Sequence, residues 1–213
     1  MSQRIAVIDY GMGNLRSVAK AVEHVADDAE VRVTDDPAYI AAADRVVFPG
    51  QGAARDCMAA IGRHHVRQAV LQAAESKPFL GICMGLQVLM QHSEENDGTD
   101  LLGVFAGEVR RFDGTAIGDS GLPLKIPHMG WSQVHQVDAH PLWDGIPDDS
   151  RFYFVHSYRV VPEDASIIAG TTDYGVRFTS AIARDNLFAT QFHPEKSADV
   201  GLRLLKNFVH WDG

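Results

Sequence analysis

The chain has 213 residues, of which 46% are hydrophobic and 22% charged, and its formal net charge at pH 7 is -9. This is the composition of a folded globular protein with one core, so we expect a single domain over residues 1–213. The negative charge argues against a nucleic-acid binder, and the lack of a signal-peptide pattern or of an apolar run near the roughly 20 residues that span a bilayer predicts a cytoplasmic protein without membrane contact.

The first half of the sequence alternates short apolar runs with segments of helical periodicity. Strands are predicted at residues 4–9, 30–34, 45–48 and 78–82. Helices are predicted at residues 14–26 and 63–75. This alternation is typical of βαβ units, so we expect an α/β fold with a doubly wound, mainly parallel central sheet flanked by helices.

The second half has a different texture, with short β-rich segments broken by Gly, Pro and Asp. These segments are residues 103–112, 131–137 and 151–155. They predict an additional smaller antiparallel β segment. Residues 199–210 return to helical spacing and are predicted to form the last helix.

The sequence contains two cysteines, Cys57 and Cys83. Two cysteines without a CxxC pair predict neither a disulfide framework nor a zinc site, so no metal is expected. Cys83 directly follows a predicted strand, and Gly81 and Gly85 flank it with the spacing of the strained strand-to-helix turn that exposes a nucleophile in hydrolases. Cys57 lies in a helical stretch and is interpreted as structural. A merely buried thiol remains the alternative for Cys83.

A thiol nucleophile needs a base, and His193 has the most suggestive setting of the ten histidines. It follows the apolar run 186–190, and Pro194 favours an extended backbone at His193. Glu195 is two residues further on, so its carboxylate can lie on the same face and orient the imidazole. By itself, His-Pro-Glu could equally be a solvated loop.

The third candidate segment is the loop that begins at Pro49, after strand 45–48. Gly50 and Gly52 would let backbone N–H groups approach a developing negative charge, as in an oxyanion hole. A simple turn is the alternative.

Three segments together resemble, in order and spacing, those of the class I (triad) glutamine amidotransferases. They are PGQG (49–52), GICMGLQ (81–87) and QFHPEKS (191–197). The resemblance implies a flavodoxin-like sheet and a hydrolysis of L-glutamine to glutamate and ammonia through a cysteinyl thioester, without a cofactor.

The same resemblance assigns roles to individual residues. The implied catalytic triad is Cys83, His193 and Glu195. The implied oxyanion hole is formed by Gly50, Gly52 and the backbone N–H of Met84. The implied glutamine-binding residues are Gln87, His156, Ser157 and Tyr158.

Further segments are similar to the glutaminase subunits of imidazole glycerol phosphate synthases, which serve histidine biosynthesis. These are residues 9–18 (DYGMGNLRSV), 127–131 (PHMGW) and 153–158 (YFVHSY). The similarity implies a heterodimer in which ammonia is channelled to a separate (β/α)₈ barrel cyclase. The implied partner interface comprises Asn14, Trp131, Tyr153 and Lys196.

The sequence departs from the family pattern at Ser132, where Asn is frequent, and at Gln51 and Ala54 in the loop after Pro49. Three alternatives stay open, namely the glutaminase of another synthase, a cysteine peptidase, and a DJ-1-like stress protein with a similar sheet and turn.

Overall fold

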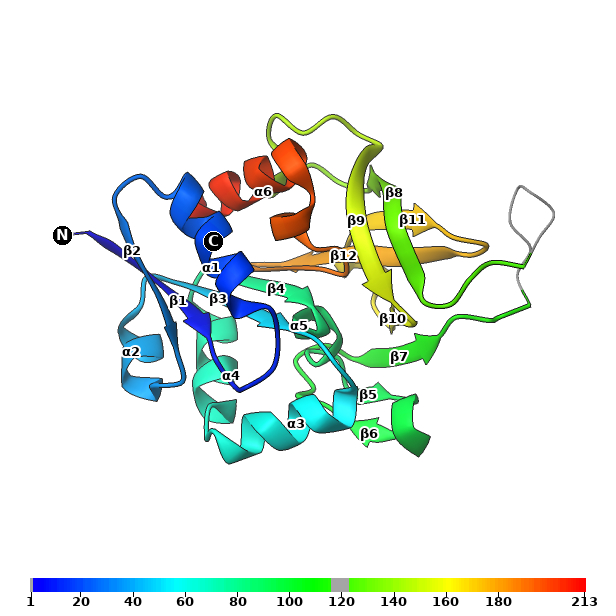
Figure 1. Cartoon of the computed structure of the whole chain (residues 1–213), viewed down its shortest axis with the longest axis horizontal. Helices are drawn as coiled ribbons and strands as arrows, with labels where there is room; N and C mark the ends of the chain where they lie inside the picture. Colours follow the sequence, from blue (N-terminus) through cyan, green and yellow to red (C-terminus); the bar gives the residue numbers. More distant parts are fainter. Residues whose placement is uncertain (1, 116–122) are drawn as a thin grey trace.

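The computed structural model describes residues 2–115 and 123–213, and one mixed sheet runs through them (Figure 1). Its parallel half has the order β2-β1-β3-β4-β13. The strands are β1 (Gln3–Ile8), β2 (Ala29–Thr34), β3 (Arg45–Gly50), β4 (Phe79–Cys83) and β13 (Leu187–Thr190). The first four strands therefore lie close to the positions predicted from their apolar runs.

The sheet continues beyond β13 through mainly antiparallel strands. The path is β12 (Arg177–Arg184), β10 (Tyr158–Pro162), β7 (Gly107–Arg111), β5 (His92–Ser93) and β6 (Thr99–Asp100). Three further strands, β11 (Ile168–Asp173), β8 (His128–Gln136) and β9 (Ser150–His156), form a branch that starts at β12. The predicted antiparallel segment thus exists, and it is continuous with the central sheet.

Helices cover both faces of the parallel half, which makes the sheet doubly wound. One face carries α1 (Leu15–Val25) and α6 (Ala198–His210), and the other carries α2 (Pro37–Ala42), α3 (Ala54–Arg63) and α4 (Arg67–Ser76) (Figure 1). The alternation along β1 explains both layers, because Ile5 and Val7 enter the core under α1 and α6 while Ala6 and Ile8 enter the other core.

The prediction of a helix at residues 63–75 is wrong about where the helix begins, because α4 starts at Arg67. Helix α3 ends at Arg63, and a turn with His65 at a φ of 56° separates it from α4. Ile61, Val66 and Val70 all face the same core, so the apolar spacing continues across the turn and hides the break. The segment 103–112 is also shorter as a strand than predicted, since β7 begins at Gly107.

Within the described residues, no helix has the length and apolar character that crossing a membrane requires. The carboxyl ends of the parallel strands meet at one edge of the sheet, and that is the edge where an open α/β sheet places its reactive groups. Cys83 is the last residue of β4, between β3 and β13.

Candidate active site

Cys83 occupies a strained turn between β4 and the short helix α5 (Met84–Gln87). Its φ of 56° and ψ of -106° lie in a region that residues with a side chain rarely adopt. Gly85 permits this turn to press against β3, because a Cβ at Gly85 would collide with the carbonyl oxygen of Phe48. The backbone thus holds the thiol at the start of α5, where unpaired helical N–H groups favour a negative charge.

His193 and Glu195 lie where the chain leaves β13, around the 3₁₀ turn η4 (Pro194–Lys196). His193 Nδ1 is 2.8 Å from Glu195 Oε1, and the side chains are 6% and 1% exposed. An ionised carboxylate can only accept, so Nδ1 carries a proton and donates it to Glu195. The other ring nitrogen, Nε2, makes no hydrogen bond of regular geometry within the described part of the chain, so it is left for chemistry with the nearby Cys83.

The backbone of His193 is fixed from two sides. Its N–H donates to the carbonyl of Tyr153 at 2.9 Å, and its carbonyl accepts from the Ser197 hydroxyl at 2.6 Å. The N–H of Tyr153 in turn donates to Ser197 Oγ at 3.0 Å. Strand β9 therefore positions the imidazole, although it is far from His193 in sequence.

Electrostatics favour a proton on His193 beside the thiol. Burial alone would lower the pKa of His193, but hydrogen bonding and charge from Cys83 and Glu195 outweigh burial and raise the pKa to about 10. A histidine that holds its proton next to a thiolate is the arrangement of an activated cysteine nucleophile.

A cavity of about 640 Å³ opens over Cys83 and His193. The predicted residues that line it are Gly52, Cys83, Met84, Gln87, His156, Ser157, Tyr158, His193 and Lys196. Residues from the first, middle and last thirds of the sequence thus surround one space. A small molecule held there would contact the thiol, the imidazole and several backbone N–H groups together.

Two buried glutamines, Gln87 and Gln191, are hydrogen-bonded to each other near Cys83. Gln87 Nε2 donates to the carbonyl of Tyr158 at 3.2 Å and to Gln191 Oε1 at 3.0 Å. Gln191 Nε2 lies 3.8 Å from Cys83 Sγ. Gln191 was not among the predicted site residues, although it lies two residues before His193 in the same motif. Both amides are buried, so they act first by holding neighbouring groups in place.

The loop that begins at Pro49, which was predicted to form the oxyanion hole, packs against buried polar groups. Gly50 is the last residue of β3 and pairs with Cys83, and a Cβ at Gly50 would collide with the Tyr10 hydroxyl. Gly50 itself does not line the cavity, whereas Gln51 and Gly52 do. Cys57 Sγ donates to the Gln51 carbonyl at 3.4 Å, and burial raises the pKa of Cys57 to about 12. Cys57 therefore has a packing environment, as its sequence position predicts.

The predicted interface residues fall into three places. Trp131 and Tyr153 face each other across β8 and β9 with ring centres 6.1 Å apart, and Trp131 is 48% exposed. Lys196 borders the cavity over Cys83. Asn14 is exposed at the start of α1.

Glu95 is a cavity residue that sequence reasoning missed. It lies in the 3₁₀ turn η1 (Glu95–Asp97), and its Oε2 accepts from the Ala54 N–H at 2.7 Å. Among the described residues that line the cavity, it is the one carboxylate. No local pattern marks it, because it reaches the site through the packing of η1 against α3.

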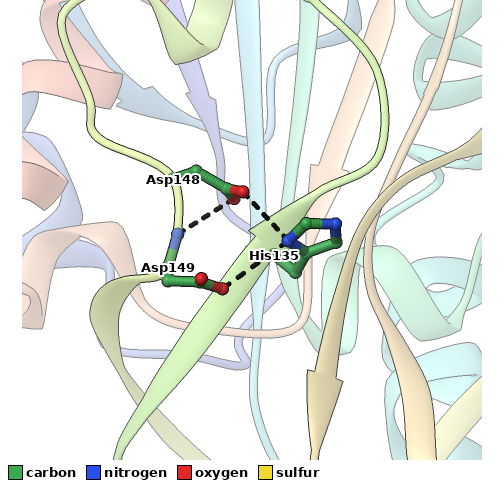
Figure 2. Close-up of side chains that lie close together, drawn as sticks. All are labelled: His135, Asp148 and Asp149. Carbon is green, nitrogen blue, oxygen red and sulfur yellow. Dashed lines mark hydrogen bonds and ion pairs between the residues drawn. The ribbon is translucent and has the colours of Figure 1, made fainter.

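One group of side chains far from Cys83 has the composition of metal ligands. Figure 2 shows His135 with Asp148 and Asp149, where His135 Nδ1 lies 3.0 Å from Asp148 Oδ2 and 3.6 Å from Asp149 Oδ1. All three are exposed, and Asp148 Oδ1 already accepts from the N–H groups of Gln136 and Asp149. The group is an exposed cluster of polar contacts that ties β8 to the loop before β9.

Comparisons with known proteins identify relatives over almost the whole length. The family model for "Glutamine amidotransferase class-I" matches residues 6–211. The imidazole glycerol phosphate synthase subunit HisH of Hydrogenovibrio crunogenus is 59% identical over 211 residues, covering 98% of this chain and 97% of that protein. The subunit of the same name from Thiobacillus denitrificans is 61% identical over 213 residues, covering 100% of this chain and 93% of that protein.

Solved structures share the fold at much lower identity. A putative GMP synthase subunit from Thermoplasma acidophilum has a TM-score of 0.70 and 18% identity, with 99% of this chain and 94% of that chain covered. A chain of PurLQS from Thermotoga maritima has a TM-score of 0.73 and 16% identity, with 99% of both chains covered.

Proposed function

The chain belongs to the class I glutamine amidotransferases and, among them, to the family of HisH subunits of imidazole glycerol phosphate synthase, and from this premise we propose how it works. It hydrolyses L-glutamine to glutamate and ammonia, and the ammonia is used by the synthase in histidine biosynthesis. The family match sets aside a peptidase or a DJ-1-like protein. The observation that carries the mechanism is that Cys83 and His193 line one cavity while Glu195 holds the His193 ring from the protein interior.

The reaction begins with attack of the Cys83 thiolate on the carboxamide carbon of glutamine. The C–N bond breaks, His193 Nε2 gives its proton to the leaving nitrogen, and ammonia departs from a glutamyl thioester. Water then attacks the thioester and loses a proton to His193, which releases glutamate and regenerates the thiolate and imidazolium. Glu195 holds Nδ1–H throughout and stabilises the charged imidazole.

The carbonyl oxygen becomes negative in both steps and needs donors. Met84 opens α5, so its N–H has no acceptor inside the helix and is assigned to this oxygen. The loop of Gly50 and Gly52 is assigned as the second source of N–H groups. The exposure of Gln51 and Gly52 to the cavity supports this assignment.

The amino-acid end of glutamine is assigned to the far side of the cavity. Glu95 keeps one carboxylate oxygen that is not bonded to Ala54, and it is placed to receive the α-ammonium group. The backbone of His156, Ser157 and Tyr158 is assigned to the α-carboxylate and ammonium. Gln87 shapes the wall next to the side-chain amide.

The proposed partner is a cyclase subunit with a (β/α)₈ barrel, present as a separate chain in a cytoplasmic heterodimer. Relatives of almost the same length carry the name of a subunit, which supports a second chain for the rest of the synthase. Trp131, Tyr153, Asn14 and Lys196 are assigned to the partner face. Residues 1–213 are taken as one domain, since both core layers lie against the same sheet.

The test is glutamate release from glutamine by the full chain, with and without the purified cyclase and its nucleotide. Wild type is expected to release glutamate faster with the cyclase, and Cys83→Ala is expected to release none. Persistent activity of Cys83→Ala would remove the assigned nucleophile. Equal wild-type rates with and without the cyclase would contradict the coupling.

A further inference from the structure

Two buried histidines, one on β8 and one on β9, lie beside the cavity over Cys83, and the second of them lines it. His128 on β8 and His156 on β9 are paired directly across the strands, and they are 1% and 5% exposed. His128 Nδ1 lies 3.0 Å from His156 Nε2. At the outer end, His128 Nε2 lies 2.8 Å from Ser132 Oγ, and at the inner end His156 Nδ1 lies 2.7 Å from the carbonyl oxygen of Tyr158.

The Tyr158 carbonyl at the inner end fixes the direction of every hydrogen bond in this series. The Tyr158 oxygen can only accept, so His156 carries its proton on Nδ1 and presents a bare Nε2. His128 must then donate from Nδ1, which leaves its own Nε2 bare. Ser132 completes the series by donating its hydroxyl proton to His128.

Both rings must be neutral for this single direction to hold, and their surroundings keep them neutral. His128 is stacked between Phe154, at 4.8 Å, and Tyr174, at 3.9 Å. Burial lowers the pKa of His128 to about 4, and burial, assisted by His128 and His193, lowers the pKa of His156 to about 3. At neutral pH neither ring has a second ring proton to reverse the chain.

At its inner end, the series of hydrogen bonds continues to the two glutamines near Cys83. The same Tyr158 oxygen accepts from Gln87 Nε2, which also donates to Gln191, and Gln191 Nε2 points at Cys83 Sγ. Hydrogen-bonded groups therefore run without interruption from Ser132 to the thiol. Tyr158, whose carbonyl joins the two halves of this run, lines the cavity together with its neighbour Ser157.

We propose that His128 is a positioning residue for glutamine binding, because its one-way hydrogen bonds between Ser132 and His156 hold the backbone of residues 156–158 against the cavity. His128 touches no substrate and acts through His156. The kinetic consequence rests on the proposed glutaminase function, whereas the proton positions do not.

The first test reads the proton positions directly. The full chain with ¹⁵N-labelled histidine is examined by NMR at neutral pH. The signals of His128 and His156 are assigned by comparison with the spectrum of His128→Phe. Both residues are expected to be protonated on Nδ1 and bare on Nε2. A proton on Nε2 of either ring would overturn the proposal, whatever the activity of the protein.

The second test separates positioning from catalysis. His128→Phe keeps an aromatic ring between Phe154 and Tyr174 but removes both nitrogens, so His156 Nε2 loses its donor. The KM for glutamine is expected to rise about tenfold, the effect of one buried hydrogen bond left unmade, while kcat changes less than about threefold. An unchanged KM, or a fall in kcat alone, contradicts the proposal.

Ser132 provides the milder variants and the rescue. Ser132→Ala removes the outer donor and is expected to raise KM in the same direction by a smaller factor, whereas Ser132→Asn keeps an N–H donor and is expected to restore the wild-type KM. These variants retain the test if His128→Phe does not fold. Equal KM values for Ser132→Ala and Ser132→Asn would contradict a role of the hydrogen bonds between Ser132 and His156.

His140→Phe is the matched control. His140 is another histidine with a pKa lowered to about 4 by burial, and it packs against the rings of Phe188 and Trp211. His140 is not in the hydrogen-bonded run, so the KM of His140→Phe for glutamine should equal that of wild type. An inactive wild-type protein would refute the proposed function, while an active protein with unaltered His128→Phe kinetics would refute only this inference.

Discussion

His193 Nδ1 and Glu195 Oε1 lie 2.8 Å apart in the interior of the protein, where both side chains are almost fully buried. At this distance and depth the carboxylate fixes the tautomer of the ring and supports its charge. Glu195→Gln should therefore reduce kcat by about a hundredfold or more, because the amide cannot stabilise the imidazolium equally well. The pKa of His193 should fall below its wild-type value of about 10.

Steady-state glutaminase kinetics and an NMR titration of His193 measure these two effects. Glu108→Gln is the control, since Glu108 makes an exposed ion pair with Arg110 that has no connection to the site. Wild-type kcat in Glu195→Gln would show that the carboxylate is a packing group.

The two thiols should differ sharply in reactivity. Cys83 lines the cavity beside a histidine that holds its proton, whereas Cys57 is fully buried and burial raises its pKa to about 12. Iodoacetamide at pH 7 should therefore alkylate Cys83 and leave Cys57 intact, because the thiolate is the reacting form. Mass-spectrometric peptide mapping measures both sites.

His193→Asn removes the proton-holding partner and should shift Cys83 alkylation to higher pH. The shift distinguishes activation by His193 from simple accessibility, which the substitution does not reduce. Alkylation of Cys57 at a rate comparable to Cys83 would contradict the assignment of the two roles.

The three residues proposed as the triad could be picked out from the sequence because each lies in a local motif. Cys83 is bracketed by two glycines after an apolar run, and His193 and Glu195 are joined by one proline turn. The strands of the parallel half were found for the same reason, since each is a short apolar run bounded by turn residues. Where apolar spacing continued through a turn, as at His65, the predicted helix began too early and ran through the turn.

The remaining site residues depend on contacts that no local pattern contains. Glu95 reaches the cavity through the packing of η1 against α3. The pairing of His128 with His156 depends on the register between β8 and β9, and a shift of one residue would turn the side chains to the opposite face. Register is set by the whole sheet, so sequence reasoning found both strands and not the bond between them.

The stability of the protein should fall as the pH drops from about 6.5 towards 5, partly because of the buried histidines. The folded-state pKa values of His128 and His156 are about 4 and about 3, so the unfolded chain binds protons in this window that the folded chain does not. Protonation therefore favours unfolding, and the loss continues as the pH approaches the folded-state values. Denaturant unfolding at pH 7 and pH 5 measures the difference.

His128→Phe should reduce this pH dependence, since one proton-binding group of the unfolded chain is removed. His210→Phe is the control because His210 is exposed on α6. An identical difference in unfolding free energy between pH 7 and pH 5 for wild type and His128→Phe would contradict the buried neutral state.

Gly85 should tolerate no side chain. A Cβ at Gly85 would collide with the carbonyl oxygen of Phe48 on β3, so Gly85→Ala must push α5 away from the sheet and should lower the unfolding free energy by about 3 kcal/mol. Gly62→Ala is the matched control within α3, where the added Cβ would meet no described atom within 4 Å apart from the neighbouring residues and backbone of its own helix. That variant should gain about 0.5 to 1 kcal/mol from helix propensity. Chemical denaturation of both variants checks the opposite signs.

Glu95 should determine how tightly glutamine binds while leaving the chemistry almost unaltered. Glu95→Gln keeps an oxygen for the Ala54 N–H but removes the charge that faces the cavity. KM should rise by about 10- to 100-fold, the usual effect of losing a charge-assisted hydrogen bond, with kcat within about threefold of wild type.

Substrate and residue controls separate recognition of the α-ammonium group from a general disturbance of the site. Glu94→Gln changes the neighbouring carboxylate, which accepts from the Arg111 N–H outside the cavity, and should leave KM unaltered. A glutamine analogue without its amino group should be hydrolysed equally poorly by wild type and Glu95→Gln, because neither protein has an ammonium group to bind. If Glu95→Gln lowers the rate with this analogue as much as with glutamine, the carboxylate supports the fold of η1 and does not recognise the substrate.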